Sequence, residues 1–223
     1  MTDEATAPTS RTALRRAVHR GRHDRATIDA ILDAGLICHV GFALDGSPWV
    51  FPTAYTRIDD GLFLHGAVAN FGLRAVVGGA EACVTVTVVD GLVLARSAFH
   101  HSMNYRSVMV FGRGAAVDDP AAKRQAMMAI VDHMVPGRAA DTRPPTDDEL
   151  RRTLVVRIPL DEASAKVRTG GPVEEPDDIG LAHWAGELPL ALRPGEPVAD
   201  VAAPGDADLA PPAYLSNWFT RLR

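Results

Sequence analysis

Residues 96–112 read R-S-A-F-H-H-S-M-N-Y-R-S-V-M-V-F-G and place many polar and aromatic side chains between two apolar segments. The flanking segments, residues 83–89 and 108–111, have the pattern of β-strands. We therefore expect a polar loop held between two strands of one sheet. Such loops on a rigid scaffold commonly carry binding and catalytic groups. The competing interpretation is a solvated hairpin with incidental polarity.

The composition indicates a globular protein with an ordinary core. The chain has 223 residues, of which 47% are hydrophobic and 23% charged, and its net charge is −5. This charge gives no reason to expect a nucleic acid or a membrane as partner. Cys38 and Cys83 lie in apolar segments without metal-ligand spacing, which favours a reducing compartment. With no signal peptide and no apolar run near roughly 20 residues, we expect a cytoplasmic protein.

Changes in composition divide the chain into three parts. Residues 1–22 form a basic arm, expected either to be flexible or to cross a partner subunit. Residues 23–190 form the folded domain. Residues 191–223 are rich in Pro, Ala and Asp, and we expect an extended tail.

Within the domain, start and stop signals predict four short helices. These signals are Asp24 with Gly35, Asn70 with Gly78, Asp119-Pro120 with Pro136-Gly137, and the capping box of Thr146 and Glu149.

The rest of the domain reads as short strands separated by turn signals. The predicted strands are residues 36–42, 49–56, 62–65, 82–89, 92–95, 108–117 and 153–160. The Asp-Gly pairs at Asp45, Asp60 and Asp90 are read as turns between them. Connections this short require antiparallel pairing. The fold class is therefore mainly β with peripheral helices, as two packed sheets or a barrel.

The sequence lacks the motifs of several kinds of site. There is no HxH or HExxH metal pattern, no GxSxG nucleophile elbow, and no strand–GxGxxG–helix unit. A flat aromatic ligand carrying a phosphate remains. Arg96, Ser97, Arg106 and Ser107 supply donors suited to phosphate, and the aromatic residues Phe99, Tyr105 and Trp184 are available for stacking.

With these residues in view, the sequence resembles the pyridoxamine 5′-phosphate oxidase-like FMN-binding split barrels, in the flavin-nucleotide-binding and nitroimidazole-resistance-type branch. The resemblance spans about residues 11–192. Its most specific part is D-G-L-V-L-A-R-S-A-F-H-H-S-M-N-Y-R-S-V-M-V-F-G at residues 90–112. Shorter motifs in the same order are I-L-D-A-G (31–35), F-P-T-A-Y (51–55), L-F-L-H-G (62–66), S-A-K-V-R-T-G-G-P (164–172) and H-W-A-G-E-L-P-L (183–190).

The resemblance implies a six-stranded antiparallel split β-barrel, a homodimer, and FMN bound at the subunit interface. Residues of both subunits would surround the flavin, with His65 as a proton donor. The implied cofactor-binding residues are Pro52, Thr53, Tyr55, His65, Gly66, Ala69, Asn70, Arg74, Tyr105, Arg106, Ser107, Lys166, Arg168 and Trp184.

One departure from the family concerns the phosphate. Many relatives have a basic triplet where this chain reads Ala69-Asn70-Phe71, so the phosphate would be met by Asn70, Arg74 or Arg106. The expected function is an FMN-dependent oxidoreductase that reduces a small acceptor such as a nitroaromatic, a quinone or oxygen. The alternatives are a non-catalytic flavin carrier or sensor, and a protein that binds F420 or haem on the same fold.

Overall fold

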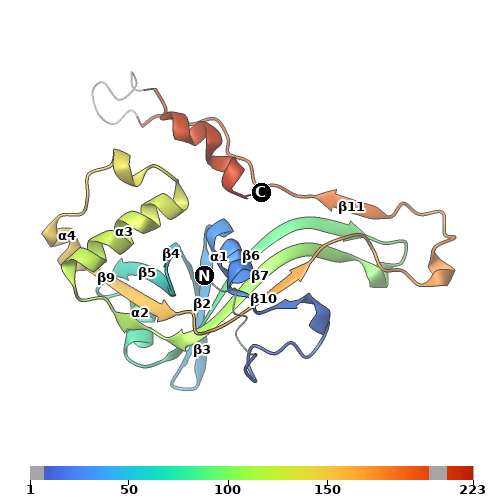
Figure 1. The fold of residues 1–223 in the computed structure, drawn as a ribbon, viewed down its shortest axis with the longest axis horizontal. Coiled ribbons are helices and arrows are strands. Elements are labelled where there is room, and N and C mark those ends of the chain that lie inside the picture. The colour runs from blue at the N-terminus through green and yellow to red at the C-terminus, as the bar shows by residue number, and fades with distance from the viewer. Residues whose placement is uncertain (1–7, 201–209, 223) are drawn as a thin grey trace.

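The computed structural model describes residues 8–200 and 210–222 (Figure 1). Two antiparallel sheets dominate it, which confirms the mainly β class predicted from the sequence. The strands are β1 Gly21–Arg22, β2 Cys38–Leu44, β3 Ser47–Thr53, β4 Tyr55–Ile58, β5 Gly61–Ala67, β6 Glu81–Leu94, β7 Ser102–Arg113, β8 Ala115–Ala116, β9 Thr153–Pro159, β10 Glu162–Arg168 and β11 Gly186–Pro189. The helices are α1 Arg25–Ala34, α2 Phe71–Val77, α3 Pro120–Met134 and α4 Asp147–Arg152, and the 3-10 helices are η1 Val18–Arg20, η2 Ala98–His100, η3 Ala139–Asp141, η4 Pro176–Asp178 and η6 Ala213–Leu222.

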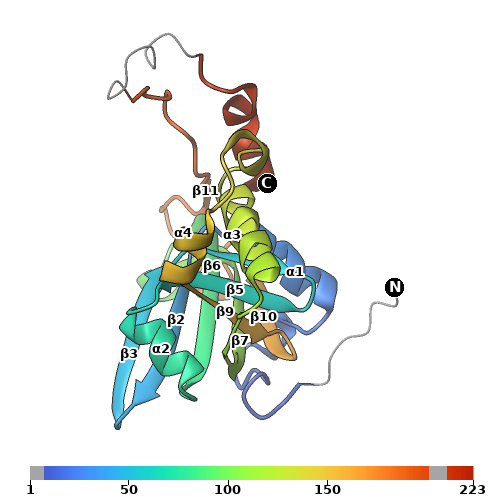
Figure 2. The same ribbon diagram turned by 90° about the vertical axis from the view of Figure 1, so that its left-hand side faces the viewer.

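The larger sheet has seven strands and the smaller sheet has four. The larger runs β1-β10-β7-β6-β2-β3, with β11 added to β6, and the smaller runs β4-β5-β9-β8. Apolar side chains from both sheets and from α1 meet in one core, which includes Leu32, Val40, Leu64, Val86 and Ile158. Helix α3 packs on the other face of the smaller sheet (Figure 2).

The predicted helix ends are confirmed where side chains cap them. Asp24 accepts a hydrogen bond from the Thr27 N–H at 2.8 Å, and Asn70 accepts one from the Leu73 N–H at 3.0 Å. Asp119 caps α3, and Thr146 and Glu149 form the predicted capping box of α4. None of the helices in the described ranges is long and apolar enough to cross a membrane.

Strand β6 corrects the prediction of a turn at Asp90-Gly91. The strand continues through these residues, and the register of its pairing with β7 shifts between Val89 and Gly91. An extra residue of this kind is a β-bulge, which bends a strand without ending it. Beyond the bulge, β6 and β7 form a projection with β11 on its edge, which we call the arm (Figure 1). Residues 95–101 connect the two strands and form the arm tip.

Three further expectations change for reasons of pairing. The polar stretch 96–112 is mainly strand, because β7 already begins at Ser102. Residues 164–172, whose charges, glycines and proline predict a loop, begin within strand β10, which pairs with β7 along its whole length. The single strand expected at 49–56 divides at Ala54 into β3 and β4, which belong to different sheets.

The terminal segments contain more regular structure than expected. In the N-terminal segment, residues 1–22, β1 pairs with β10, and residues 1–7 lie outside the described ranges. Within the predicted tail, residues 191–200 have no regular secondary structure and 213–222 form η6, while 201–209 and 223 lie outside those ranges. Residues 183–189, whose sequence lacks periodicity and predicts irregular structure, contain β11.

Candidate functional site

The predicted site residues fall into two groups on different parts of the chain. The first group lies where β3 passes into β4, beside the end of β5 and the start of α2. Tyr55 pairs with Leu64, so the residues just before Tyr55 lie beside those just after Leu64. This brings together Pro52, Thr53, His65, Gly66, Ala69, Asn70 and Arg74.

Glycine at position 66 permits a close approach within this first group. A Cβ atom there would lie 2.9 Å from Leu73 Cδ1 and 3.3 Å from Asn70 Nδ2. The Asn70 side chain is already used to cap α2. Arg74 is exposed and borders a shallow pocket with Ala69 and Phe71, so it is the cation that this group offers to an anion.

His65 is half-buried on β5, opposite Val155 of β9. Burial lowers the pKa of its imidazole below the ordinary value, so the neutral ring is favoured. Its Nδ1 atom is buried and has no hydrogen-bond partner in the described part of the chain. A neutral imidazole with an unsatisfied nitrogen can donate or accept a hydrogen bond, whereas the predicted role as a proton donor needs the protonated ring that burial disfavours.

Tyr55 belongs to the core. Its side chain is fully buried, and its hydroxyl reaches the carbonyl oxygens of Leu32 and Gly35 at the end of α1. His133 of α3 packs on its ring with centroids 4.7 Å apart. The side chain thus joins α1, β4 and α3 and leaves only the backbone of this residue for a ligand.

The second group lies on the outer face of the larger sheet. Ser107 pairs with Lys166 and Tyr105 with Arg168, so these four positions share one face of β7 and β10. The Ser107 hydroxyl donates to the Lys166 carbonyl oxygen at 3.4 Å. A hydroxyl, a phenol and an ammonium group therefore lie together on this face.

The same face continues across the sheet to Pro52. The pairings Met109–Thr85, Thr85–His39 and His39–Pro52 carry it from β7 to β3. Among the described residues much of this face is uncovered, since Val50 is 69% and Met109 40% exposed, whereas Ser164 and Arg168 at its β10 edge are buried. An uncovered sheet face with apolar side chains is typical of an interaction surface.

Arg106 points to the opposite face from its neighbours Tyr105 and Ser107. Its Nε and Nη2 atoms donate to the two carboxylate oxygens of Asp90 at 2.9 and 2.7 Å. This bidentate pair raises the pKa of the guanidinium and neutralises its charge. The predicted contact of Arg106 with a phosphate would require this pair to separate.

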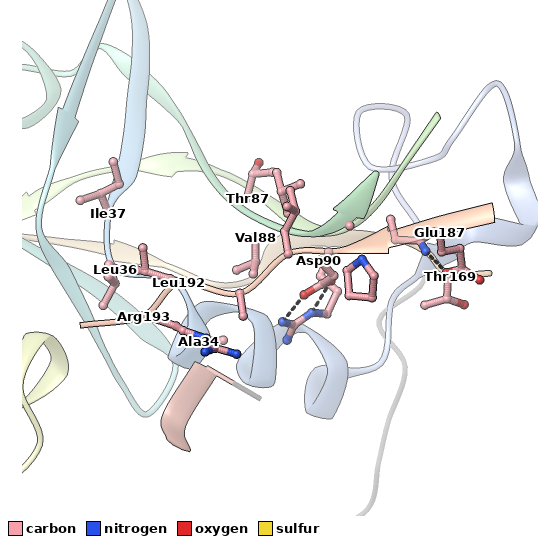
Figure 3. A pocket seen from close by; sticks show the side chains of 18 of the residues that line it. Ala34, Leu36, Ile37, Thr87, Val88, Asp90, Thr169, Glu187, Leu192 and Arg193 are labelled. Atoms are coloured by element: carbon pink, nitrogen blue, oxygen red, sulfur yellow. Dashed lines mark hydrogen bonds and ion pairs between the residues drawn. The ribbon is translucent and has the colours of Figure 1, made fainter. Parts of the chain in front are cut away.

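Arg106 and Asp90 border a cavity of about 1100 Å³ that the sequence did not predict (Figure 3). Its walls come mainly from three segments, which are the residues after α1, strand β6, and the chain from β11 onward. Asn104 and Arg106 of β7 and Thr169 and Gly170 complete the lining. Leu36, Ile37, Val88, Leu190 and Leu192 make the lining largely apolar, and Arg193 adds a second cation. No motif joins these three segments in the sequence, and only the fold places them together.

Arg168 has a structural role in the connection after β10. Its guanidinium donates to Asn104 Oδ1, to the Gly170 carbonyl at 2.6 Å and to the Gly171 carbonyl at 2.9 Å. Burial lowers the pKa of this side chain. Lys166 therefore remains as the cation that the outer face offers to an anion. Trp184 lies before β11, exposed, with its ring against Gly186.

Comparisons with known proteins place this geometry in a family. A family model described as pyridoxamine 5′-phosphate oxidase matches residues 24–167. The structure of the flavocytochrome Anf3 from Azotobacter vinelandii is 35% identical, with a TM-score of 0.87, and the match covers 96% of this chain and 98% of that one. An FAD and haem binding protein from Mycobacterium smegmatis is 34% identical, with a TM-score of 0.84, over 90% of this chain and 97% of its own.

A further structure is similar over a smaller share of the chain. A putative 5-nitroimidazole antibiotic resistance protein from Bacteroides thetaiotaomicron is 26% identical with a TM-score of 0.56, and the match covers 66% of this chain and 86% of that one. No curated protein matches the chain. The family model spans more than half of the sequence, and the two sheets have the expected antiparallel arrangement. The chain therefore belongs to the pyridoxamine 5′-phosphate oxidase-like family of split-barrel proteins.

Proposed function

We propose that this protein is a homodimeric redox protein that binds both a flavin and a haem. The observation that carries the proposal is the extent of the similarity to the flavocytochrome Anf3, which covers 96% of this chain at 35% identity. A match of that extent includes most of the segment after the barrel. The nitroimidazole resistance protein covers only 66% of the chain. The added segment is thus shared with proteins described as binding haem.

The donor groups on the chain fit a flavin phosphate. Ser107, Tyr105 and Lys166 lie half-buried on one face and supply hydroxyl and ammonium donors, which phosphate oxygens accept. The first group around His65 and Gly66 lies at the β3–β4 junction of the same chain. A ligand bound between two copies contacts one half-site from each copy. This chain carries both half-sites on separate parts of its surface, as that arrangement requires.

The uncovered face of the larger sheet fits a second copy of this chain. Val50, Val89 and Met109 are exposed on it, beside the proposed phosphate donors. Burying such side chains stabilises association in proportion to the apolar area removed from water. The homodimer and the flavin site would therefore form together.

The residues of the arm tip and of the segment between β10 and β11 fit a haem. A haem needs apolar contacts and an axial ligand, commonly a histidine. Phe99, Ile179 and Trp184 are exposed apolar side chains in this region, and His101 and His183 are exposed histidines.

When bound, a flavin supplies hydride and single-electron transfer, and a haem supplies one-electron and oxygen chemistry. The protein would bind and orient both groups. The neutral imidazole of His65 would lie at the edge of the flavin half-site, where it can donate a hydrogen bond. The acceptor we propose is oxygen or another small oxidant, such as a quinone or a nitroaromatic compound.

The test is to purify the protein without added cofactor and to identify what it carries. We expect flavin and haem absorption bands in a dimer-sized species. Acid release followed by chromatography would distinguish FMN from FAD, and the pyridine haemochrome would measure haem. A monomer that carries neither group and takes up neither FMN, FAD nor haemin would overturn the proposal. A flavin-loaded protein that no donor can reduce would instead indicate a carrier or sensor.

A pair of variants tests the phosphate donor. Lys166→Ala should weaken flavin binding by about ten- to a hundredfold, since a hydrogen bond to a charged group contributes about 1.5–3 kcal/mol. Arg15→Ala, which removes an exposed cation from the N-terminal segment, is the matched control. Equal flavin affinity in the two variants would exclude Lys166 from the phosphate site.

A further inference from the structure

The arm tip lies at the outer end of the β6–β7 projection (Figure 1). It carries an exposed aromatic ring and an exposed imidazole. Phe99 is 87% exposed, and His101 is exposed two residues later. The Phe99 ring contacts the ring of His100, with centroids 5.2 Å apart. A phenylalanine this exposed loses the free energy of burial unless another apolar surface covers it.

The tip is held in place by contacts with the segment after β10. The carboxylate of Glu174 accepts one hydrogen bond from the Arg96 backbone N–H and another from its guanidinium. Within the tip, the His100 N–H donates to the Ser97 carbonyl oxygen at 3.3 Å. These contacts, together with β6 and β7 on either side, fix the backbone that carries His101.

The tautomer of His101 follows from its hydrogen bond. The Nδ1 atom lies 3.0 Å from the Ser97 carbonyl oxygen. A carbonyl oxygen can only accept, so Nδ1 carries the proton and Nε2 of the neutral ring carries a lone pair. Histidines that bind metals typically donate their other N–H to a carboxylate or backbone carbonyl in this way, which orients the ring.

Two other groups show that the tip is incomplete in the single chain. Arg96 Nε and the Ser97 hydroxyl are buried, and neither has a hydrogen-bond partner among the residues described. Buried polar groups are nearly always paired in a finished structure. Both residues lie within five positions of His101, so the unsatisfied groups and the free imidazole nitrogen occur at one place.

We propose that Nε2 of His101 is an axial ligand of the haem iron and that the exposed Phe99 ring packs against the macrocycle. The inference rests on the proposed haem binding and assigns its protein ligand. The tip lies on the outside of the chain, so the opposite wall of the haem site would come from the second copy of the dimer.

Three other described histidines fit this role less well. His133 is buried, and its Nε2 atom lies 2.7 Å from the Gly35 carbonyl oxygen, inside the helix–sheet contact. The Nε2 atom of His100 lies 3.6 Å from a Glu175 carboxylate oxygen. His65 has a buried Nδ1 with no carbonyl to orient its ring. Among these side chains, the carbonyl-oriented ring with an exposed second nitrogen is that of His101.

The test compares His101→Gly with His100→Gly in the whole protein as purified. We expect His101→Gly to lower the haem-to-protein ratio at least about tenfold, because even residues that only orient a metal ligand change affinity by about 10–100-fold. Adding imidazole with haemin should restore binding to this variant. His100→Gly should keep the wild-type ratio and Soret band. Flavin content and circular dichroism report whether each variant is folded.

His101→Met gives a second readout that does not depend on loss of binding. A thioether ligand changes the field at the iron, so the Soret band and the reduction potential should shift while haem stays bound. Wild-type haem content and spectrum in both His101 variants would overturn the assignment and leave haem binding intact. A wild-type protein that holds no haem and takes up no haemin would overturn both proposals.

Discussion

Arg106 and Asp90 meet across the bulge in β6, where the guanidinium of one donates two hydrogen bonds, of 2.9 and 2.7 Å, to the carboxylate of the other. The bulge makes this contact possible, because Asp90 is the extra residue between Val89 and Gly91 and has no partner in the β7 ladder. The pair therefore links β6 to β7 at the bulge, where the core part of the sheet continues into the arm.

The first prediction concerns the energy of this pair. The side chains are 23% and 33% exposed, so solvent screens them in part, and we expect a coupling of about 1 kcal/mol. Asp90→Ala and Arg106→Ala should each lower the free energy of unfolding, and the double variant should lose less than the sum. Urea unfolding of the four proteins measures the coupling. Strict additivity would show that the two side chains act independently.

Tyrosines 55 and 105 should respond differently to loss of the hydroxyl group. Tyr55→Phe removes the donor that reaches the Leu32 and Gly35 carbonyl oxygens in the core, which should lower the free energy of unfolding by about 1–3 kcal/mol. Tyr105→Phe on the outer face should change stability by less than about 0.5 kcal/mol, as surface substitutions usually do. Thermal or urea unfolding checks both, and equal effects would contradict the division into core and surface.

Gly35 should tolerate no side chain. A Cβ atom there would meet Val86 Cγ1 and would lie 2.8 Å from the Tyr55 hydroxyl oxygen. Gly35→Ala should therefore destabilise the protein by about 1–3 kcal/mol through overpacking. Gly180→Ala is the matched control, because a Cβ atom at Gly180 meets nothing within 4 Å. If the two variants unfolded at the same denaturant concentration, the packing described between α1 and β6 would be wrong.

The lowered pKa of His65 predicts a dependence of stability on pH. Burial favours the neutral ring in the folded state, so the unfolded chain binds the proton more readily. This contribution to stability is complete above the ordinary value near 6.5 and is lost as the pH falls through the lowered folded-state value. The free energy of unfolding of the wild type should fall more steeply below pH 6.5 than that of His65→Gln. Parallel curves for the two proteins would place the His65 ring in solvent.

The parts of the fold that depend on local chemistry could be predicted from the sequence. Asp24, Asn70, Asp119 and Thr146 cap their helices as expected, because a capping side chain bonds backbone groups only two or three residues away. The antiparallel class could also be predicted, because a short connection between two strands depends only on residues close together in the sequence.

The parts that depend on pairing could not be predicted. Asp-Gly usually marks a turn, but at Asp90 the ladder with β7 continues past it and makes a bulge instead. Strand β10 contains Ala163, Ala165 and charged residues, which have weak strand propensity, and it forms because β7 pairs with it. The partner of Arg106 was missed because it depends on that bulge.

The candidate site was predicted as a set of residues and not as an arrangement. The sequence motifs named both half-sites, but only the sheet register showed that Ser107 and Lys166 share one face while Arg106 points to the other. The cavity and the exposed ring of Phe99 depend on the path of the chain after β10, for which the sequence has no periodic signal.

Strand β6 runs without a break from the barrel core at Val84 to the arm at Leu94. A hydrogen-bonded ladder shared in this way leaves no hinge between the two regions, since swinging the arm would require several of its backbone hydrogen bonds to break. The separation between the tip and the outer sheet face is therefore set by the length and twist of one strand pair. If each end holds an electron carrier, this strand pair fixes the distance over which electrons pass.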